Sequence, residues 1–492
     1  MKRTPSSEAA VIRELWDRTT VGRLARQFAQ IATDALLVQE GAVRRRGSSA
    51  IAGRILGARG RSPLALVRQI QRSSLRLAHP RYIAQQVAAP IPMAALIESV
   101  VAALNQSLAV WEMSPIATAI DRQLMVRFRS LFGYPRSAEG TLVPGGAFGN
   151  LTALLAAREA LDRDRARTAT ARIAVIVGAQ THYSIARAAA ILGLSPDAVF
   201  RVPVDREFCT DVARIPEAFA AARKAGFRKF ILVGSAGSTS TGSFDRLEEL
   251  RRLATREGAW LHVDAAHGAA LAFSRRLQRR VRGIGATDSL VFDPHKMMFM
   301  PLTAGGVLVR NGSRLATPLA ERAPYLFGAR RRWPDIGQLT IACSQRFDAL
   351  KIWLVWQVYG ARVWDALVSH TCRVCEAAFR YCARSRILLP LHEPHSNILC
   401  FRLRRARGRD SDRIHWNIKE ELNESGYGYI SSTVLEGRRV LRLTVMNPRT
   451  RIQDLEDVLS RIERIAGARR APTAARSRSR RKSARARSSR TD

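Results

Sequence analysis

The feature of the sequence that most restricts its fold is a series of short apolar runs separated by helical stretches. The runs at residues 171–177, 230–234, 260–264 and 289–292 are rich in β-branched and other apolar side chains. Helical patterns occupy several of the gaps, for example residues 185–192 and 247–257. Strands that are apolar throughout are typical of a parallel sheet covered on both faces. The sequence therefore predicts a large α/β domain with a mostly parallel sheet over residues 79–360.

The segments on either side of this domain have different patterns. Residues 1–78 carry apolar side chains at helical spacing but too few for a core of their own, so we expect an N-terminal helical segment that needs a partner surface. Residues 361–466 combine long helices with β-rich runs at 397–403 and 439–446, which predicts a small C-terminal α/β domain. Residues 467–492 hold ten Lys or Arg and almost no apolar side chains, which predicts a disordered basic tail.

The composition is that of a soluble globular protein with a strongly basic charge. Hydrophobic residues make up 47% and charged residues 25% of the chain, and the formal net charge is +39. No apolar stretch approaches the roughly 18 residues of a membrane span, and the first residues lack the pattern of a secretory signal. Six cysteines in 492 residues do not suggest a disulfide framework. We therefore expect a cytoplasmic protein without a membrane anchor.

A lysine with apolar neighbours follows the last of the predicted strands. Lys296 comes directly after His295, and the Met-rich residues 297–300 lie beyond it. Burial favours the uncharged form of an amine, and an uncharged amine can attack an aldehyde and hold it as a Schiff base. The ordinary alternative is a surface lysine that extends from a loop. Three other segments favour the chemical interpretation.

These segments supply the groups that a pyridoxal ring would need. Asp264 ends the run 260–264, where a carboxylate can keep a pyridine nitrogen protonated. The glycine-rich turn at residues 145–150 precedes a helix, and the free backbone N–H groups at the start of that helix suit a phosphate. His182 follows the run 171–177, where its imidazole could stack on a planar ring. Each of these signals alone is weak evidence for a pyridoxal site. Their order along the chain is stronger evidence.

In this order the motifs resemble the group II pyridoxal-phosphate-dependent amino-acid decarboxylases, which include the glutamate, 2,4-diaminobutyrate and aromatic amino-acid enzymes. The resemblance extends from about residue 79 to residue 467. Its anchors are the turn at 145–150, HPRY (79–82), NQSLAVWEMSPIAT (105–118), THYSIARAA (181–189), HVDAA (262–266), DSLVFDPHKMM (288–298), CSQRFDALKIW (343–353) and LRLTVMNP (441–448).

The resemblance implies a fold and a set of roles. The fold would be that of the fold-type I transferases, with a seven-stranded sheet and helices on both faces, and the cofactor would be pyridoxal 5'-phosphate. Lys296 would be the Schiff-base lysine, Asp264 the partner of the ring nitrogen and His182 the group over the ring. The other implied contacts are Ala266 under the ring, Gly146, Ala147, Ser240, Ser289 and His295 near the phosphate, and Gln85 and Arg442 on the substrate side.

The implied activity is α-decarboxylation of an L-amino acid to the amine and carbon dioxide, in a homodimer whose active site lies between subunits. The sequence departs from the family pattern in a mobile loop. Family members that reliably return a proton to the α-carbon often carry a tyrosine in this loop. Pro334 occupies that position here, with Trp333 beside it and no tyrosine closer than Tyr325. An aldehyde-forming or transaminating enzyme on the same scaffold is therefore an alternative, and His182 is a candidate proton donor.

Two further patterns have plain alternatives. Cys372 and Cys375 form a CxxC pair, but no second pair follows at zinc spacing, so we expect buried thiols and no metal. The basic tail at 467–492 could contact nucleic acid weakly. A cofactor-binding protein without catalysis that binds nucleic acid is thus a third possibility, and the retained Lys296, Asp264 and His182 argue against it.

Overall fold

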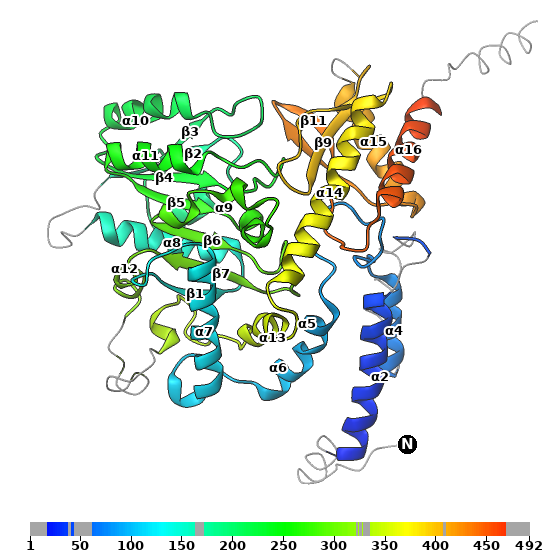
Figure 1. Ribbon diagram of the computed structural model, residues 1–492, viewed down its shortest axis with the longest axis horizontal. Coiled ribbons are helices and arrows are strands. Elements are labelled where there is room, and N and C mark those ends of the chain that lie inside the picture. The colour runs from blue at the N-terminus through cyan, green and yellow to red at the C-terminus, as the bar shows by residue number, and fades with distance from the viewer. Residues whose placement is uncertain are drawn as a thin grey trace, which may run out of the picture.

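The computed structural model describes residues 17–37, 41–43, 62–162, 172–320, 323, 327, 335–406 and 410–468. These residues form two β-sheets with their helices and a pair of N-terminal helices that extend away from the sheets (Figure 1). The predicted tail beyond residue 468 and the loop positions Tyr325, Trp333 and Pro334 lie outside the described residues.

The large sheet has seven strands in the order β1-β7-β6-β5-β4-β2-β3. The pairs from β6 to β3 are parallel, whereas β7 runs antiparallel to both of its neighbours, β1 and β6. All six residues of β2 are buried, and because successive side chains point to opposite faces, both faces of the sheet are covered. The predicted mostly parallel seven-stranded sheet is confirmed. Its strands are β1 (Glu139–Val143), β2 (Ile173–Gly178), β3 (Val199–Val202), β4 (Lys229–Ser235), β5 (Trp260–Asp264), β6 (Ser289–Phe292) and β7 (Gly305–Val309).

Helices pack around this sheet and connect its strands. Helix α8 contacts β5, β6 and β7, while α10 and α11 cover β2 to β5. The helices of this part are α5 (Pro92–Leu96), α6 (Glu98–Leu104), α7 (Pro115–Leu131), α8 (Gly146–Leu161), α9 (Ser184–Ile191), α10 (Ile215–Lys224), α11 (Leu247–Glu257), α12 (Ser313–Ala316) and α13 (Ala349–Tyr359). Short 3-10 turns are η1 (Trp111–Met113), η2 (Val212–Arg214), η3 (Gly268–Phe273), η4 (Gln278–Val281), η5 (Ile284–Ala286) and η6 (Ile336–Gln338).

The small sheet is antiparallel and has its own apolar cluster, which includes Phe401, Leu443 and Leu459. Its strands are β8 (Leu388–Pro390), β9 (Ile398–Leu403), β10 (Ser431–Leu435) and β11 (Arg438–Thr444), in the order β10-β11-β9-β8. Helices α15 (Ser411–Ser425) and α16 (Ile452–Ala468) pack with it, and α14 (Arg362–Arg384) contacts both this sheet and η3. This arrangement agrees with a separate C-terminal unit, and the boundaries at 78, 360 and 466 stay predictions.

The N-terminal helices α2 (Arg18–Leu37) and α4 (Pro63–Ser73) lie side by side and point away from the large sheet (Figure 1). No residue of α4 is buried, and Val21, Phe28 and Ile70 expose between 38% and 49% of their surface. An amphipathic helix pair with so little cover has an apolar face available to a further surface.

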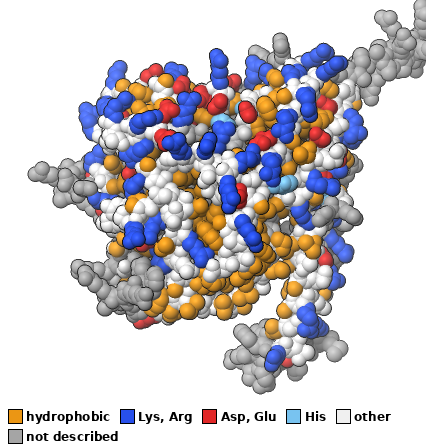
Figure 2. Space-filling view, in the orientation of Figure 1, with side chains coloured by type: hydrophobic (Ala, Val, Ile, Leu, Met, Phe, Trp, Pro, Cys, Tyr) orange, Lys and Arg blue, Asp and Glu red, His pale blue; other side chains and the backbone are white. Residues whose placement is uncertain are grey.

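On the face drawn in Figure 2 the positive charge is dispersed. Figure 2 shows Lys and Arg side chains spread over the visible face rather than collected in a single patch. Among the described helices, none combines the length and the apolar character needed to cross a membrane. Cys372 and Cys375 are buried, as predicted for core thiols, and Cys382 on the same helix is buried too.

Buried histidines make the folded chain sensitive to acid. Burial lowers the pKa of His262, His392 and His395 to about 4 and that of His267 to about 3, from 6.5. Below pH 6.5 the unfolded chain therefore binds more protons than the folded chain. The free energy of unfolding is thus largest above pH 6.5 and decreases as the pH falls toward 4. Each of these histidines is expected to lower the free energy of unfolding by about 2 kcal/mol at pH 5.

We expect the free energy of unfolding, measured with urea, to be several kcal/mol smaller at pH 5 than at pH 7. Equal stability at the two pH values would contradict the burial of these neutral imidazoles.

Candidate active site

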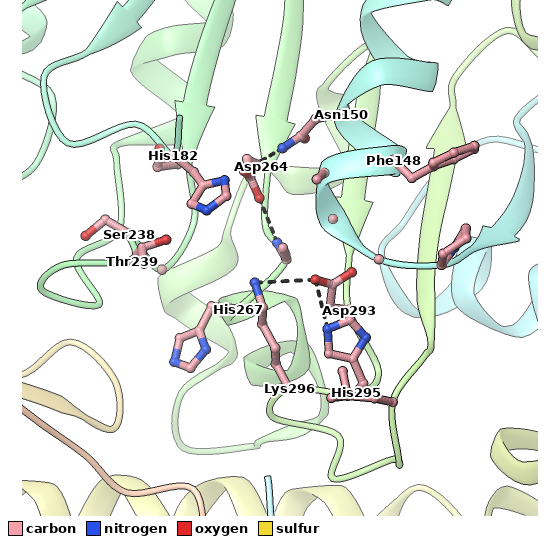
Figure 3. Close-up of a pocket in the computed structure, with 18 residues that line it drawn as sticks. Phe148, Asn150, His182, Ser238, Thr239, Asp264, His267, Asp293, His295 and Lys296 are labelled. Atoms are coloured by element: carbon pink, nitrogen blue, oxygen red, sulfur yellow. Dashed lines mark hydrogen bonds and ion pairs between the residues drawn. The ribbon is translucent and has the colours of Figure 1, made fainter. Parts of the chain in front are cut away.

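A cavity of about 470 Å³ lies where β4 and β5 end, at the start of α8 and beside the loop after β6 (Figure 3). This is the position at which open α/β sheets bind ligands. The cavity is lined by residues that the sequence places far apart, which are Pro144 to Phe148, Asn150, His182, Ser235, Gly237 to Thr239, Asp264, Ala266, His267, Asp293, His295, Lys296 and Leu302.

The amine of Lys296 reaches into this cavity from the loop after β6. A turn in which the Lys296 N–H donates to the Asp293 carbonyl positions the residue. Residues 297–300 are buried behind it, so the apolar run anchors the loop, while the lysine side chain keeps 20% of its surface exposed. The amine is therefore held at the cavity wall with access to a ligand.

Asp293 places a buried carboxylate next to this amine. Its Oδ2 lies 3.3 Å from Lys296 Nζ and 3.5 Å from His295 Nε2. His295 Nδ1 accepts the N–H of Ala304 at 3.1 Å, so the ring proton sits on Nε2 and faces Asp293. Burial lowers the pKa of His295, and Asp293 opposes that effect. The lysine amine is thus the nearer of the two basic groups beside this carboxylate.

Asp264 ends strand β5 and presents its carboxylate to the cavity. Its Oδ2 accepts a hydrogen bond from Asn150 Nδ2 at 2.8 Å, and its Oδ1 accepts the Ala266 N–H at 3.1 Å. Within the described residues, Asp264 forms no ion pair with a Lys, Arg or His side chain. A carboxylate held by neutral donors remains free to pair with a cation of a bound ligand.

His182 lies on the other side of the cavity, in the turn before α9. Its Nδ1 is 2.7 Å from Ser184 Oγ and accepts the Ser184 N–H at 3.3 Å, so the ring proton sits on Nε2. Burial lowers the pKa of His182. The ring is therefore a neutral, planar group whose orientation the serine fixes.

The start of α8 provides the phosphate end of the cavity. Gly146 and Ala147 occupy its first two positions, where N–H groups have no acceptor within the helix. A Cβ at Gly146 would lie 2.9 Å from Asp293 Oδ2 and 3.0 Å from the Ala266 Cβ. The missing side chain therefore lets Asp293 and Ala266, two residues of the cavity wall, approach the start of the helix. Together with the amine of Lys296 and the carboxylate of Asp264, these groups fit pyridoxal phosphate.

Four residues implied by the resemblance do not line the cavity. Ser289 begins β6, whereas the cavity lies beyond the other end, about 10 Å away at the usual rise per residue. Its hydroxyl contacts Trp260 and His262 instead, so the structure does not support its predicted phosphate contact. Ser240 is also absent from the lining, where Ser238 and Thr239 take its place.

Arg442 and Gln85 are bonded to each other behind the cavity wall. Arg442 Nη2 donates to Gln85 Oε1 at 3.2 Å, and its Nη1 donates to the carbonyl of Thr239 at 3.0 Å. Arg442 is buried and neither residue lines the cavity. Their substrate contacts stay predictions, and the structure gives Arg442 the separate task of holding Thr239.

Sequence reasoning assigned no role to several polar residues of the site, among them Asn150 and His267. Asn150 follows Gly146 by one helical turn, so the spacing alone could have indicated that both face the cavity. His267 lines the cavity and is buried, with Nε2 2.7 Å from Asn397 Oδ1. No signal in the sequence connects His267 with Asn397, because the pair depends on how the two sheets meet.

Comparisons with known proteins agree with this site. The model of the pyridoxal-dependent decarboxylase conserved domain matches residues 67–404. The L-2,4-diaminobutyrate decarboxylase of Rhizobium meliloti is 33% identical over 390 residues, which cover 78% of this chain and 76% of the relative. The aromatic-L-amino-acid decarboxylase of Bacillus atrophaeus is 30% identical over 344 residues, which cover 69% and 71%.

The fold is also found in a solved structure. The crystal structure of mouse CSAD superposes with a TM-score of 0.84 at 24% identity and covers 91% of this chain and 99% of that one. The family model spans more than half of this chain, and the R. meliloti relative matches over most of its own length. The chain therefore belongs to the pyridoxal-dependent decarboxylase family, whose members are carboxy-lyases with pyridoxal phosphate as cofactor.

Proposed function

We propose that this chain removes the α-carboxyl group of an L-amino acid and releases the amine and carbon dioxide, with Lys296 as the point of covalent attachment of the cofactor. The observation that carries the proposal is the placement of the Lys296 amine, the Asp264 carboxylate and the His182 imidazole around one cavity. The unpaired N–H groups at the start of α8 complete this set. When bound, pyridoxal phosphate supplies an electron sink for the pair left by the departing carboxyl group.

The protein's own groups bind, orient and move protons in this proposal. The Gly146 and Ala147 N–H groups hold the phosphate, and the Asp264 carboxylate keeps a proton on the ring nitrogen. Ala266 packs against the ring. His182 carries its proton on Nε2, and we assign to it the return of a proton to the α-carbon of the substrate.

Product analysis tests the reaction. The holoenzyme is incubated with each common amino acid and with 2,4-diaminobutyrate, ornithine and cysteine sulfinate, and carbon dioxide and amine are measured together. Equal amounts of the two from one substrate class would support decarboxylation. Aldehyde with ammonia or hydrogen peroxide as the main products would contradict it. The screen also defines the side chain that is accepted, since the named relatives act on substrates as different as diaminobutyrate and aromatic amino acids.

We further propose that the active form is a cytoplasmic homodimer in which α2 and α4 pack on a second copy. The exposed apolar residues Val21, Phe28 and Ile70 support this proposal, because a monomer would leave them in water. Light scattering of the holoenzyme is expected to give twice the chain mass of 54.6 kDa. A monomer mass at micromolar concentration would contradict the proposal.

A further inference from the structure

A chain of buried hydrogen bonds runs along β5 toward the carboxylate of Asp264. Trp260, His262 and Asp264 alternate along this strand and therefore point to the same face of the sheet. The indole N–H of Trp260 donates to Ser289 Oγ at 2.9 Å, and that oxygen lies 2.9 Å from His262 Nδ1. His262 Nε2 is 2.9 Å from Asn150 Oδ1, and Asn150 Nδ2 donates to Asp264 Oδ2 at 2.8 Å.

The middle of this chain is sealed from water. Ser289 and His262 expose none of their surface and Asn150 exposes 1%, because helix α8 covers β5 and β6 at this point. Only the amide of Asn150 and the carboxylate of Asp264 reach the cavity (Figure 3). Each buried group must therefore find its hydrogen-bond partners within this series of side chains. If one side chain took the opposite orientation, a buried polar atom would be left unpaired.

The direction of the chain is fixed from both ends. A carboxylate only accepts, so Asn150 must present its Nδ2 to Asp264 and its Oδ1 to His262. His262 must then carry its proton on Nε2. Burial lowers the pKa of His262 to about 4, so the ring is neutral and its Nδ1 accepts. At the other end an indole N–H only donates, which leaves the Ser289 hydroxyl hydrogen for His262 Nδ1.

Asn150 connects the same chain to His182. Its Nδ2 lies 2.9 Å from Ser184 Oγ, and that hydroxyl is 2.7 Å from His182 Nδ1. One amide group thus orients both the carboxylate and the imidazole on which the proposed function depends. If this amide rotated by half a turn, its oxygen would face the carboxylate and its NH2 group would face the N–H of His262, so the oriented His262 adds to the carboxylate's own opposition to that rotation.

We propose that His262 and Ser289 are positioning residues that act on the bound cofactor at a distance, by locking the Asn150 amide so that it always donates to Asp264. The inference rests on the proposed role of Asp264 as the partner of the ring nitrogen. The lock keeps a hydrogen-bond donor on the carboxylate and keeps the carboxylate aimed at the ring nitrogen, which in turn keeps a proton on that nitrogen. Ser289 thereby receives a role at the opposite end of β6 from the phosphate.

Two substitutions of nearly equal volume at His262 separate this role from packing. His262→Met removes the N–H that faces Asn150, whereas His262→Gln keeps an N–H donor at the end of a chain of similar length. Both are made in the full-length holoenzyme. The readouts are the retained cofactor, the pH midpoint of its visible absorbance band, and kcat and KM separately.

In His262→Met we expect the cofactor to stay attached and the midpoint of the band to rise by about one pH unit. A proton on the ring nitrogen makes it harder to add a second proton to the nitrogen of Lys296. In the variant the ring nitrogen holds its proton less firmly, so the nitrogen of Lys296 takes up its own proton at higher pH. We expect kcat to fall roughly tenfold with KM unchanged. His262→Gln is expected to recover most of both effects.

Ser289→Ala repeats the test with a smaller change and decides it if His262→Met does not fold. It should move the midpoint in the same direction, whereas Ser274→Ala, which removes an equally buried hydroxyl bonded to Ser369, should leave it in place. A wild-type midpoint and kcat in both His262→Met and Ser289→Ala, or equal losses in His262→Met and His262→Gln, would overturn the inference alone. A wild-type protein without any cofactor band would instead overturn the proposed function.

Discussion

Replacing Lys296 with alanine is expected to abolish the visible absorbance band of the attached cofactor and to lower kcat by at least about a thousandfold. The amine of Lys296 is the one that lines the cavity, and the buried residues 297–300 fix the loop that carries it. No other lysine lines the cavity among the described residues, so none can substitute for it. Absorbance of the protein after incubation with pyridoxal phosphate and removal of the free cofactor measures the first effect.

Lys229→Ala is the matched control for this variant. Lys229 lies at the start of β4, where its amine is 3.2 Å from Asp162 and outside the cavity. This control should keep both the band and the activity. A Lys296→Ala protein that still carries cofactor trapped by borohydride would contradict the assignment of the amine.

Replacing Asp264 with asparagine is expected to leave the cofactor attached and to lower kcat by about a hundredfold or more. The carboxylate at the end of β5 carries the negative charge that stabilises the protonated ring nitrogen, and the asparagine variant lacks this charge. The amide also meets donors on both sides, from Asn150 and from the Ala266 N–H, so one of these bonds is lost. The measurement is kcat together with the cofactor content of the purified variant.

Asp288→Asn is a control that removes the charge of a carboxylate outside the cavity, just before β6. Its Oδ2 accepts from a side chain, Arg251 at 2.9 Å, and from a backbone N–H, that of Leu261 at 2.8 Å, but the residue does not line the cavity. Because both bonds end on one oxygen, the amide oxygen of asparagine can keep them, and the variant loses the ion pair with Arg251. This loss should lower stability and leave kcat nearly unchanged. Near-normal turnover in Asp264→Asn would remove this carboxylate from the account.

Local pattern was sufficient to predict much of the large domain. The apolar runs 260–264 and 289–292 have the same bounds as β5 and β6, and the helical pattern at 247–257 coincides with α11. Strand β5 has a buried middle and carries no charged residue before its last position, so the carboxylate at its end is conspicuous. That is why Asp264 could be selected from the sequence before its neighbours were known.

The remainder of the site depends on contacts between elements that are distant in the sequence. Asn150 bonds to Asp264 across 114 positions and His267 to Asn397 across 130, and no periodicity encodes these pairs. Ser289 illustrates the limit most clearly. Resemblance suggested a phosphate contact, but its place at the first position of β6 points its hydroxyl to Trp260 and His262.

The central claim is that the amine of Lys296 forms the covalent bond to pyridoxal phosphate. Borohydride reduction of the purified holoenzyme makes such a bond permanent, and peptide mapping by mass spectrometry then locates it. We expect a single pyridoxyl group, on the peptide that contains Lys296. A group found on another lysine, or a protein that carries no such group, would contradict it.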